Sequence, residues 1–162
     1  SVHEYPTSEQ MAEIAISAAR VVRLFGFDPK VAFVSHSTFG QPLTNRTKHI
    51  KNAVEILRQK NVNFEFDGDM QPDVALDEEY KSLYPFSKIV GNANILIMPG
   101  QHSAAISYKL MKTLGETKVI GPLLIGLGLP IEIAPLRSST SELINLASIA
   151  AYSADIINYK KN

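Results

Sequence analysis

The stretch VAFVSH, residues 31–36, decides the fold class. It is apolar, rich in β-branched and aromatic side chains, and too short for a helix, which is typical of a buried strand. A polar loop follows at 37–46. From Thr47 onward, apolar residues recur at helical spacing up to the basic segment 58–60, whose positive charge suits the end of a helix. The sequence therefore predicts a strand, a loop and a helix in that order.

The same alternation extends in both directions along the chain. On the N-terminal side, Thr7 and Gln10 have the spacing of a capping box, and apolar residues at helical spacing continue to Gly26. On the C-terminal side the pattern predicts strands at 63–68, 93–99, 118–127 and 131–134, and helices at 73–84, 104–115 and 140–159. We expect Thr140 or Ser141 to cap the last helix.

Strands that alternate with helices predict an α/β fold with three layers, αβα. We expect a mostly parallel sheet of about five strands with helices on both faces. In such a sheet, ligands bind beyond the carboxyl ends of the strands, where loops lead into helices. Those loops are expected at 35–46, 67–73, 98–103 and 121–126.

The composition limits the class of protein. The chain has 162 residues, with 16 basic and 16 acidic side chains and no net charge at pH 7. A chain of this length can bury a hydrophobic core without disulfides or metals, so we expect one domain. Since proteins that bind nucleic acids carry basic surfaces, we expect no nucleic-acid partner.

The absence of cysteine excludes disulfides, thiolate metal sites and a cysteine nucleophile, and it fits a reducing, cytoplasmic location. The apolar stretch 119–131 is interrupted by Gly and Pro and is too short to cross a membrane, so no membrane partner is expected. The chain begins SVHEYPTSEQ, without an initiator Met and without a signal-peptide pattern. We therefore expect residues 1–162 to be a single domain or subdomain of a longer protein.

The first of the expected loops combines groups that suit an anion. Hydroxyl groups and a glycine follow the strand, and two basic residues lie where the next helix begins, an arrangement that can bind a phosphate or a carboxylate. The candidate ligand-binding residues are Ser35, Ser37, Thr38, Gly40, Arg46 and Lys48. The loop matches neither a Walker loop nor a dinucleotide fingerprint, so a polar connection with a helix cap is an equally good interpretation.

The acidic stretch DGDMQPDVALDEEY, residues 67–80, raises the question of a metal site. It lacks the alternating ligands and the closing Glu of a calcium loop, so we expect no metal. Asp73 is predicted to cap a helix, and residues 77–79 are predicted to form the solvent-exposed face of that helix. His36 and His102 lie on the expected ligand side, whereas His3 and His49 are predicted to be structural or superficial.

The order of several segments resembles a known family, over about residues 7–152. The chain resembles the second half of the phosphate acetyltransferase domain of the phosphate acetyl/butyryltransferase family, and more closely the version at the C-terminus of bacterial NADP-dependent malic enzymes. This resemblance implies the isocitrate/isopropylmalate dehydrogenase-like fold of phosphotransacetylases. The segments that carry it are SEQMAEIAISAARVVRLFGFDPKVAFVSHSTFG, DGDMQPDVALD, ANILIMPG with AAISYK, KVIGPLLIGLGLPI and INLASIAAYSA.

The chain departs from the active transferases in two loops. Where the family has Ser-Arg-Gly, this chain has Pro135, Leu136 and Arg137, so the guanidinium is displaced by one position, while Glu142 keeps the family's downstream carboxylate. In the loop after the strand expected at 93–99, Gly100, His102 and Ala105 replace the family's polar residues. Since catalysis tolerates little displacement, we expect transferase activity to be lost and no residue to be catalytic.

The resemblance also implies a function. We expect a regulatory segment that senses acetyl-CoA or a related CoA ligand, with His102 and Arg137 as further ligand contacts, and that helps a homo-oligomer to assemble. No cofactor is expected in this segment. NADP and a divalent metal, Mg or Mn, would belong to the parent enzyme, whose N-terminal malic enzyme domains would decarboxylate malate to pyruvate. Two alternatives remain open: a phosphate acetyltransferase with a drifted active site, and an assembly module without a ligand.

Overall fold

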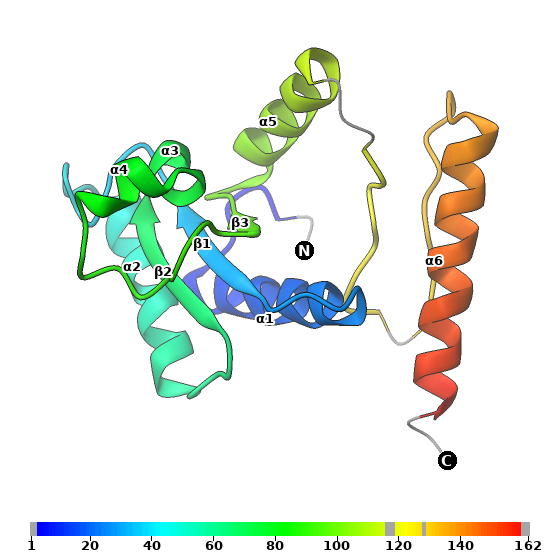
Figure 1. The fold of residues 1–162 in the computed structure, drawn as a ribbon, viewed down its shortest axis with the longest axis horizontal. Coiled ribbons are helices and arrows are strands. Elements are labelled where there is room, and N and C mark those ends of the chain that lie inside the picture. The colour runs from blue at the N-terminus through cyan, green and yellow to red at the C-terminus, as the bar shows by residue number, and fades with distance from the viewer. Residues whose placement is uncertain (1–2, 116–118, 128, 160–162) are drawn as a thin grey trace. The chain divides into compact units, whose positions relative to one another are not determined.

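The computed structural model describes residues 3–115, 119–127 and 129–159. The chain divides into two compact units, Ser1–Lys109 and Leu110–Asn162, and each is described by itself. The helices and strands, drawn in Figure 1, are α1 (Ser8–Leu24), β1 (Lys30–Val34), α2 (Asn45–Gln59), β2 (Glu65–Met70), α3 (Pro72–Leu76), α4 (Glu78–Ser82), β3 (Ile95–Ile97), α5 (Gln101–Leu114) and α6 (Thr140–Tyr159). The expectation that 1–162 is a single domain or subdomain of a longer chain stays a prediction.

The first unit is built around a parallel sheet in the order β2-β1-β3. The central strand β1 is buried because both neighbours and both faces cover it, as its apolar sequence predicts. On one face, α1 and α2 pack through residues such as Met11, Ile50 and Leu57 against Val31 and Phe33. The sheet therefore has a helical layer on this face.

The opposite face of the sheet carries a second, smaller core. Ala32 of β1 and Met70 of β2 pack there with Val74 and Ala75 of α3 and with Ile89. Helices thus lie on both faces of a parallel sheet, which confirms the predicted α/β fold with three layers (Figure 1).

Helix α1 forms where its sequence predicts. The Thr7 hydroxyl accepts a hydrogen bond from the Gln10 backbone N–H at 3.2 Å, and the Gln10 side chain accepts one from the Thr7 N–H at 2.9 Å. These bonds satisfy two N–H groups that would otherwise lack partners at the helix start. The helix ends just before Gly26, whose φ of +83° suits glycine, so the predicted capping box and glycine stop are confirmed.

Three local predictions were wrong. The helix expected over 73–84 is interrupted, because Asp77 adopts an extended conformation that ends α3, and its carboxylate accepts the Glu79 N–H at 2.8 Å to cap α4. Asp73 lies inside α3 and bonds the N–H of the next residue, so it is not the cap. In α6 the cap is Ser139, whose hydroxyl accepts the Glu142 N–H at 3.3 Å.

The sheet of the described residues has three strands, fewer than the five expected. The segments predicted as strands at 118–127 and 131–134 run without regular secondary structure wherever they are described, with positions 118 and 128 outside the described residues. Pro122 and Pro130 remove backbone N–H groups from these segments, and a strand requires a hydrogen-bonded neighbour to form. Apolar composition alone does not supply that neighbour.

The second unit contains α6 and the segments that lead to it. The Glu142 carboxylate bonds the Ser139 N–H at 2.7 Å and the Lys112 ammonium at 3.2 Å, so one side chain both caps α6 and ties it to the end of α5. The hydrogen bond from the Ser139 N–H, and to a smaller extent the contact with Lys112, holds the pKa of the Glu142 carboxyl below its usual range.

Candidate functional site

Backbone hydrogen bonds set the conformation of the loop that follows β1. The Ser35 N–H donates to the Met70 carbonyl at 2.9 Å and so continues the pairing of β1 with β2. Thr38 and Gln41 then bond each other through their backbones around a tight turn, with φ of 50° at Phe39 and 85° at Gly40. Two successive positive φ angles are typical of a type I′ turn, which explains the glycine.

A buried carboxylate at the end of β2 organises this loop. Asp69 is only 2% exposed. Its side chain accepts hydrogen bonds from the Ser37 hydroxyl and from the Gly40 N–H, the latter at 3.0 Å. Its backbone carbonyl accepts the Phe39 N–H at 2.6 Å. Because a buried carboxylate is costly unless it is hydrogen-bonded, Asp69 and the loop stabilise each other.

The remaining hydroxyls of the loop are also engaged. The Thr38 hydroxyl accepts the Gln71 N–H at 3.2 Å, and the Ser35 and Ser37 hydroxyl oxygens lie 3.4 Å apart. The structure therefore brings Ser35, Ser37, Thr38 and Gly40 together, as the sequence analysis proposed. They are buried or half-buried, and Ser37, Thr38 and Gly40 bond Asp69 or Gln71, so these groups stabilise the loop itself.

Arg46 lines a surface pocket of about 300 Å³, and none of those hydroxyl residues is part of its lining. The centre of its guanidinium lies 5.5 Å from the Tyr5 ring centroid, a cation–π arrangement that holds the side chain at the pocket wall. The pocket is lined by Tyr5, Pro6, Thr7, Met11, Asn45, Arg46, His49, Ile50 and Pro99. None of these lining residues carries a carboxylate, and Pro99 follows the carboxyl end of β3.

His49 connects the pocket to the start of α1. Its Nε2 lies 3.2 Å from the Pro6 carbonyl oxygen and donates to it, while its own carbonyl accepts the Ser8 hydroxyl at 2.9 Å. Glu9 lies nearby, and hydrogen bonds from its own N–H and from Thr7 hold the pKa of its carboxyl below the ordinary value. The structural role predicted for His49 is present, and in addition the residue lines the pocket.

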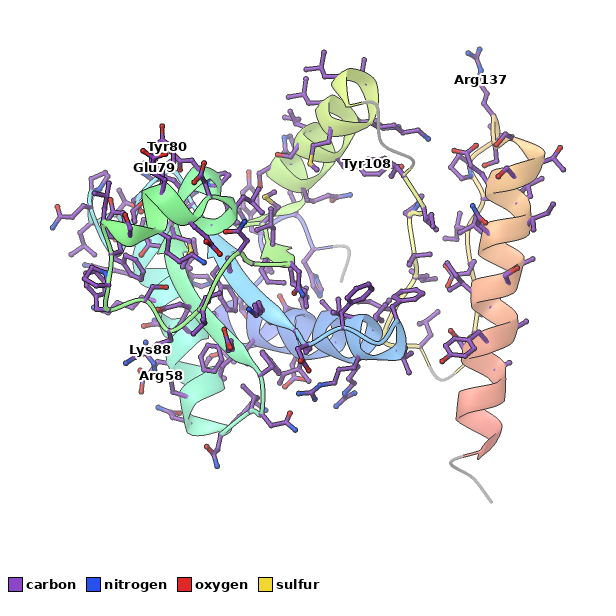
Figure 2. All side chains as sticks on the ribbon, in the orientation of Figure 1. Arg58, Glu79, Tyr80, Lys88, Tyr108 and Arg137 are labelled. Carbon is purple, nitrogen blue, oxygen red and sulfur yellow. The ribbon has the colours of Figure 1, made fainter. Side chains whose placement is uncertain are left out.

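The other predicted contacts lie elsewhere. Lys48 is exposed on α2 and is not among the residues that line the Arg46 pocket. The His102 side chain is 79% exposed, and its Nε2 lies 3.7 Å from a Glu4 carboxylate oxygen. Arg137 belongs to the second unit, where its exposed side chain extends away from the loop before α6 (Figure 2).

The acidic stretch that suggested a metal site has a structural explanation. The buried Asp67 accepts the Lys88 N–H at 2.8 Å and lies 3.8 Å from the Arg58 guanidinium, and both of these residues are labelled in Figure 2. Among the described residues, no three metal-binding side chains come together. No helix in the described part of the chain is long and apolar enough to cross a membrane.

Sequence reasoning missed Asp69, Tyr5 and the pocket. Asp69 was interpreted only as part of an acidic run, although its position next to the end of a predicted strand placed it beside the loop of Ser37. Tyr5 and Pro99 are 94 positions apart, and no local pattern indicates that they line one pocket with Arg46. The position of Arg46 just before the helix predicted from Thr47 was the one available signal.

Comparison with known proteins identifies the family to which this fold belongs. Residues 1–151 match the phosphate acetyl/butaryl transferase family, and the chain belongs to this family. It is similar to a phosphotransacetylase from Streptococcus pyogenes, with a TM-score of 0.88 and 33% identity over 96% of this chain and 47% of that one. The fold predicted from the resemblance is thereby confirmed.

Within this family the chain is similar to two kinds of protein. It is 47% identical to an NADP-dependent malic enzyme of Rhizobium meliloti, over 95% of this chain and 20% of that protein. It is 36% identical to a phosphate acetyltransferase of Clostridium acetobutylicum, over 95% of this chain and 47% of that protein. The chain thus spans about a fifth of the malic enzyme and about half of the transferase. It is a phosphotransacetylase-like domain of the kind found in malic enzymes.

Proposed function

We propose that this chain is a regulatory, non-catalytic phosphotransacetylase-like segment of an NADP-dependent malic enzyme, and that it binds acetyl-CoA. The observation that carries the proposal is the Arg46 pocket, which offers a fixed guanidinium and no carboxylate among its lining residues. An anionic ligand with an apolar portion fits that lining, and a CoA thioester has both features.

The pocket supplies two kinds of contact for such a ligand. The guanidinium of Arg46 and the first two N–H groups of α2, those of Asn45 and Arg46, can bind phosphate oxygens, because the N–H groups at a helix start lack partners within the helix. The third, that of Thr47, is already bonded to the Thr44 hydroxyl at 3.2 Å. The Tyr5 ring, Met11 and Ile50 offer apolar surface. A pocket of about 300 Å³ is at the small end of ligand sites, so it would hold one part of the ligand and leave the rest outside.

Residues of the second unit support the proposed lack of acetyl transfer. Pro135 and Leu136 occupy the positions of the family's Ser and Arg, and the Leu136 side chain is fully exposed. The Glu142 carboxylate, which occupies the family's carboxylate position, bonds Lys112 and caps α6. Arg137 is exposed to solvent, and the ion pair of Glu142 among the described residues is with Lys112. These features support binding without acetyl transfer.

The rest of the proposed function concerns the parent protein. The parent would oxidatively decarboxylate malate to pyruvate in the cytoplasm, with NADP and a divalent metal acting at residues outside this chain. This segment would transmit the presence of acetyl-CoA to the N-terminal malic enzyme domains and contribute to a homo-oligomer. The similarity to NADP-dependent malic enzymes supports this part of the proposal.

The test compares Arg46→Ala with Lys48→Ala in the full-length protein that carries this chain. Both variants remove one cation from the first turns of α2, but only Arg46 lines the pocket. We expect calorimetry to show acetyl-CoA binding in the parent protein, at least about tenfold weaker binding in Arg46→Ala, and little change in Lys48→Ala. Inhibition of malate oxidation by acetyl-CoA should weaken in parallel.

Two results contradict the proposal, and each favours one alternative. Formation of acetyl phosphate from acetyl-CoA and phosphate would identify a transferase with a drifted site. Absence of acetyl-CoA binding in the parent protein would identify an assembly module without a ligand. Equal binding in the parent protein, in both single variants and in the double variant would show that the ligand does not use the Arg46 pocket.

A further inference from the structure

Another pocket of the first unit lies between α1 and the segment that joins α2 to β2. It has a volume of about 430 Å³, with the C-terminal half of α1 as one wall and residues 61–64 as the other. This segment precedes the start of β2, so the pocket lies at the amino end of the strand, away from the loops at the carboxyl ends. The lining residues are Ile16, Ala19, Arg20, Arg23, Asn61, Val62, Asn63 and Phe64. The lining thus combines two guanidinium groups, two amides and apolar side chains, without a carboxylate.

The Arg23 guanidinium reaches from one wall of this pocket to the other. Its Nη2 donates to the Asn63 carbonyl oxygen at 2.6 Å, although Arg23 belongs to α1 and Asn63 to the segment before β2. Both residues line the pocket and both are exposed, so this guanidinium lies at the pocket wall and within reach of solvent. An arginine side chain carries five N–H donors, and the bond to Asn63 uses one of them. The others are available to a ligand.

Arg20 lies one turn before Arg23 on the same face of α1. Residues three positions apart are neighbours on a helix surface, so both guanidinium groups can approach one bound group. The Arg20 side chain is exposed and forms neither a hydrogen bond nor an ion pair within residues 3–115, 119–127 and 129–159. The preceding acid on this face, Glu13, is paired with the Lys60 ammonium at 3.0 Å. The pocket therefore has a surplus of positive charge.

The rest of the lining supplies further donors and an apolar surface. The side-chain amides of Asn61 and Asn63 are exposed and form no hydrogen bond in the part of the chain that the structure describes. Ile16, Val62 and Phe64 are half-buried beside them. A ligand with an anionic group and an apolar portion can contact both kinds of surface at once.

We propose that this pocket binds a small organic phosphate monoester, whose phosphate oxygens accept hydrogen bonds from Arg20 and Arg23 and whose organic part lies against Phe64. A phosphate dianion matches two positive charges, and its terminal oxygens can accept several N–H donors at once. A monocarboxylate would leave one guanidinium uncompensated. The pocket shares no lining residue with the Arg46 pocket, so the proposal does not depend on acetyl-CoA binding.

The test measures the binding of phenyl phosphate to the full-length protein that carries this chain, by calorimetry with NADP in excess so that an NADP site is already filled. Arg20→Gln removes a guanidinium that bonds no described residue, so the variant should fold. Lys51→Gln removes the charge of an exposed lysine of α2 and serves as the control. We expect binding to weaken at least about tenfold in Arg20→Gln and to stay unchanged in Lys51→Gln. Arg20→Lys keeps the charge without the planar fork and should restore part of the affinity.

The pH dependence gives a second readout. The charged groups at the pocket are Arg20, Arg23, Glu13 and Lys60, and no histidine lines it, so the ligand is the group that changes charge near neutral pH. A phosphate monoester takes its second negative charge at a pKa of about 6, so affinity should rise several-fold from about pH 5 to about pH 7.

Several results would overturn the proposal: unchanged affinity in Arg20→Gln, an equal loss in Lys51→Gln, or no binding at tens of millimolar. Succinate that binds as tightly as phenyl phosphate, or an affinity that does not vary with pH, would overturn the choice of a phosphate. Binding that is retained in Arg20→Gln and lost in Arg46→Ala would place phenyl phosphate in the Arg46 pocket instead. We expect the reverse, with phenyl phosphate binding unchanged in Arg46→Ala whether or not that variant loses acetyl-CoA.

Discussion

At the scale of single residues, the site depends on buried polar groups that satisfy one another. The Asp69 carboxylate accepts the Ser37 hydroxyl and the Gly40 N–H, and its backbone carbonyl accepts the Phe39 N–H, so this one residue holds the loop after β1 at three points. Lys81 is the opposite case, since its buried ammonium has no hydrogen-bond partner among the described residues.

Ser37→Ala tests the structural role of the Asp69 cluster. The substitution removes the hydroxyl donor and leaves a buried carboxylate oxygen without it, so the free energy of unfolding should fall by about 1–3 kcal/mol. Urea denaturation measures the loss. Ser82→Ala is the control, because its hydroxyl bonds a helix carbonyl at the surface, and it should change stability by less than about 0.5 kcal/mol. Equal losses in the two variants would refute this account of Asp69.

Gly68→Ala tests the close approach of β2 to β1. A Cβ at this position would lie 2.7 Å from the Phe33 Cβ and 2.8 Å from the Phe33 carbonyl oxygen, and φ is already +151°. Gly26→Ala is the matched control, since its φ of +83° is also unfavourable but no atom lies within 4 Å of the new Cβ. Thermal and urea unfolding should show a loss of about 1 kcal/mol for Gly26→Ala and at least about twice that for Gly68→Ala. Similar losses would mean that the strands can separate at little cost.

At the scale of elements, hydrogen bonds at helix ends contribute to stability, and the contribution at the start of α6 can be measured through its pH dependence. The Ser139 N–H, followed by Lys112, holds the pKa of Glu142 below its ordinary value of 4.5. Because the folded state favours the ionised form, this stabilisation is present above pH 4.5 and is lost as the pH falls through the lower folded pKa. Glu142→Gln should therefore be less stable than the parent protein at pH 7, and the difference should shrink in acid. A difference that is constant with pH would show that the charge of Glu142 contributes nothing.

Elements with local signals could be predicted from the sequence. The Thr7 capping box, the glycine stop at Gly26 and the buried run of β1 depend on neighbours in the chain, and each is confirmed. The cap of α6 was predicted at Thr140 or Ser141 but is Ser139. Consecutive hydroxyl residues have the same capping preference, and only the reciprocal bonds with Glu142 show which of them is the cap. The strands expected at 118–127 and 131–134 failed because pairing is not a local property.

At the scale of the whole molecule, the sequence predicted the fold class and the family, whereas the candidate site was predicted only in part. The loop of Ser37 and Thr38 was found because strand ends indicate ligand loops in α/β folds. The Arg46 pocket was not, since Tyr5, His49 and Pro99 come from separate segments that only the folded chain joins. The burial of Asp69 and Lys81 likewise depends on tertiary packing, which no motif encodes.

The last prediction concerns self-association through α6. The helix exposes Leu143, Ile144 and Tyr152, with Ile144 60% exposed, which is apolar surface that association would remove from water. Leu146 of the same helix is only 5% exposed, so it does not belong to this surface. The side chains of Ile156 and Ile157 lie outside the described residues. We expect sedimentation at micromolar concentration to show an oligomer.

The matched variants Ile144→Glu and Ser148→Glu place the same charge at an apolar and a polar exposed position of α6. If association buries the apolar side chains, Ile144→Glu should weaken it at least about tenfold, because burying an unpaired charge is costly, while Ser148→Glu should change it much less. A monomeric parent protein, or equal effects of the two variants, would exclude α6 as an association surface. Retention of the oligomer in Ile144→Glu would have the same meaning, since one buried charge outweighs the apolar area that a single isoleucine contributes.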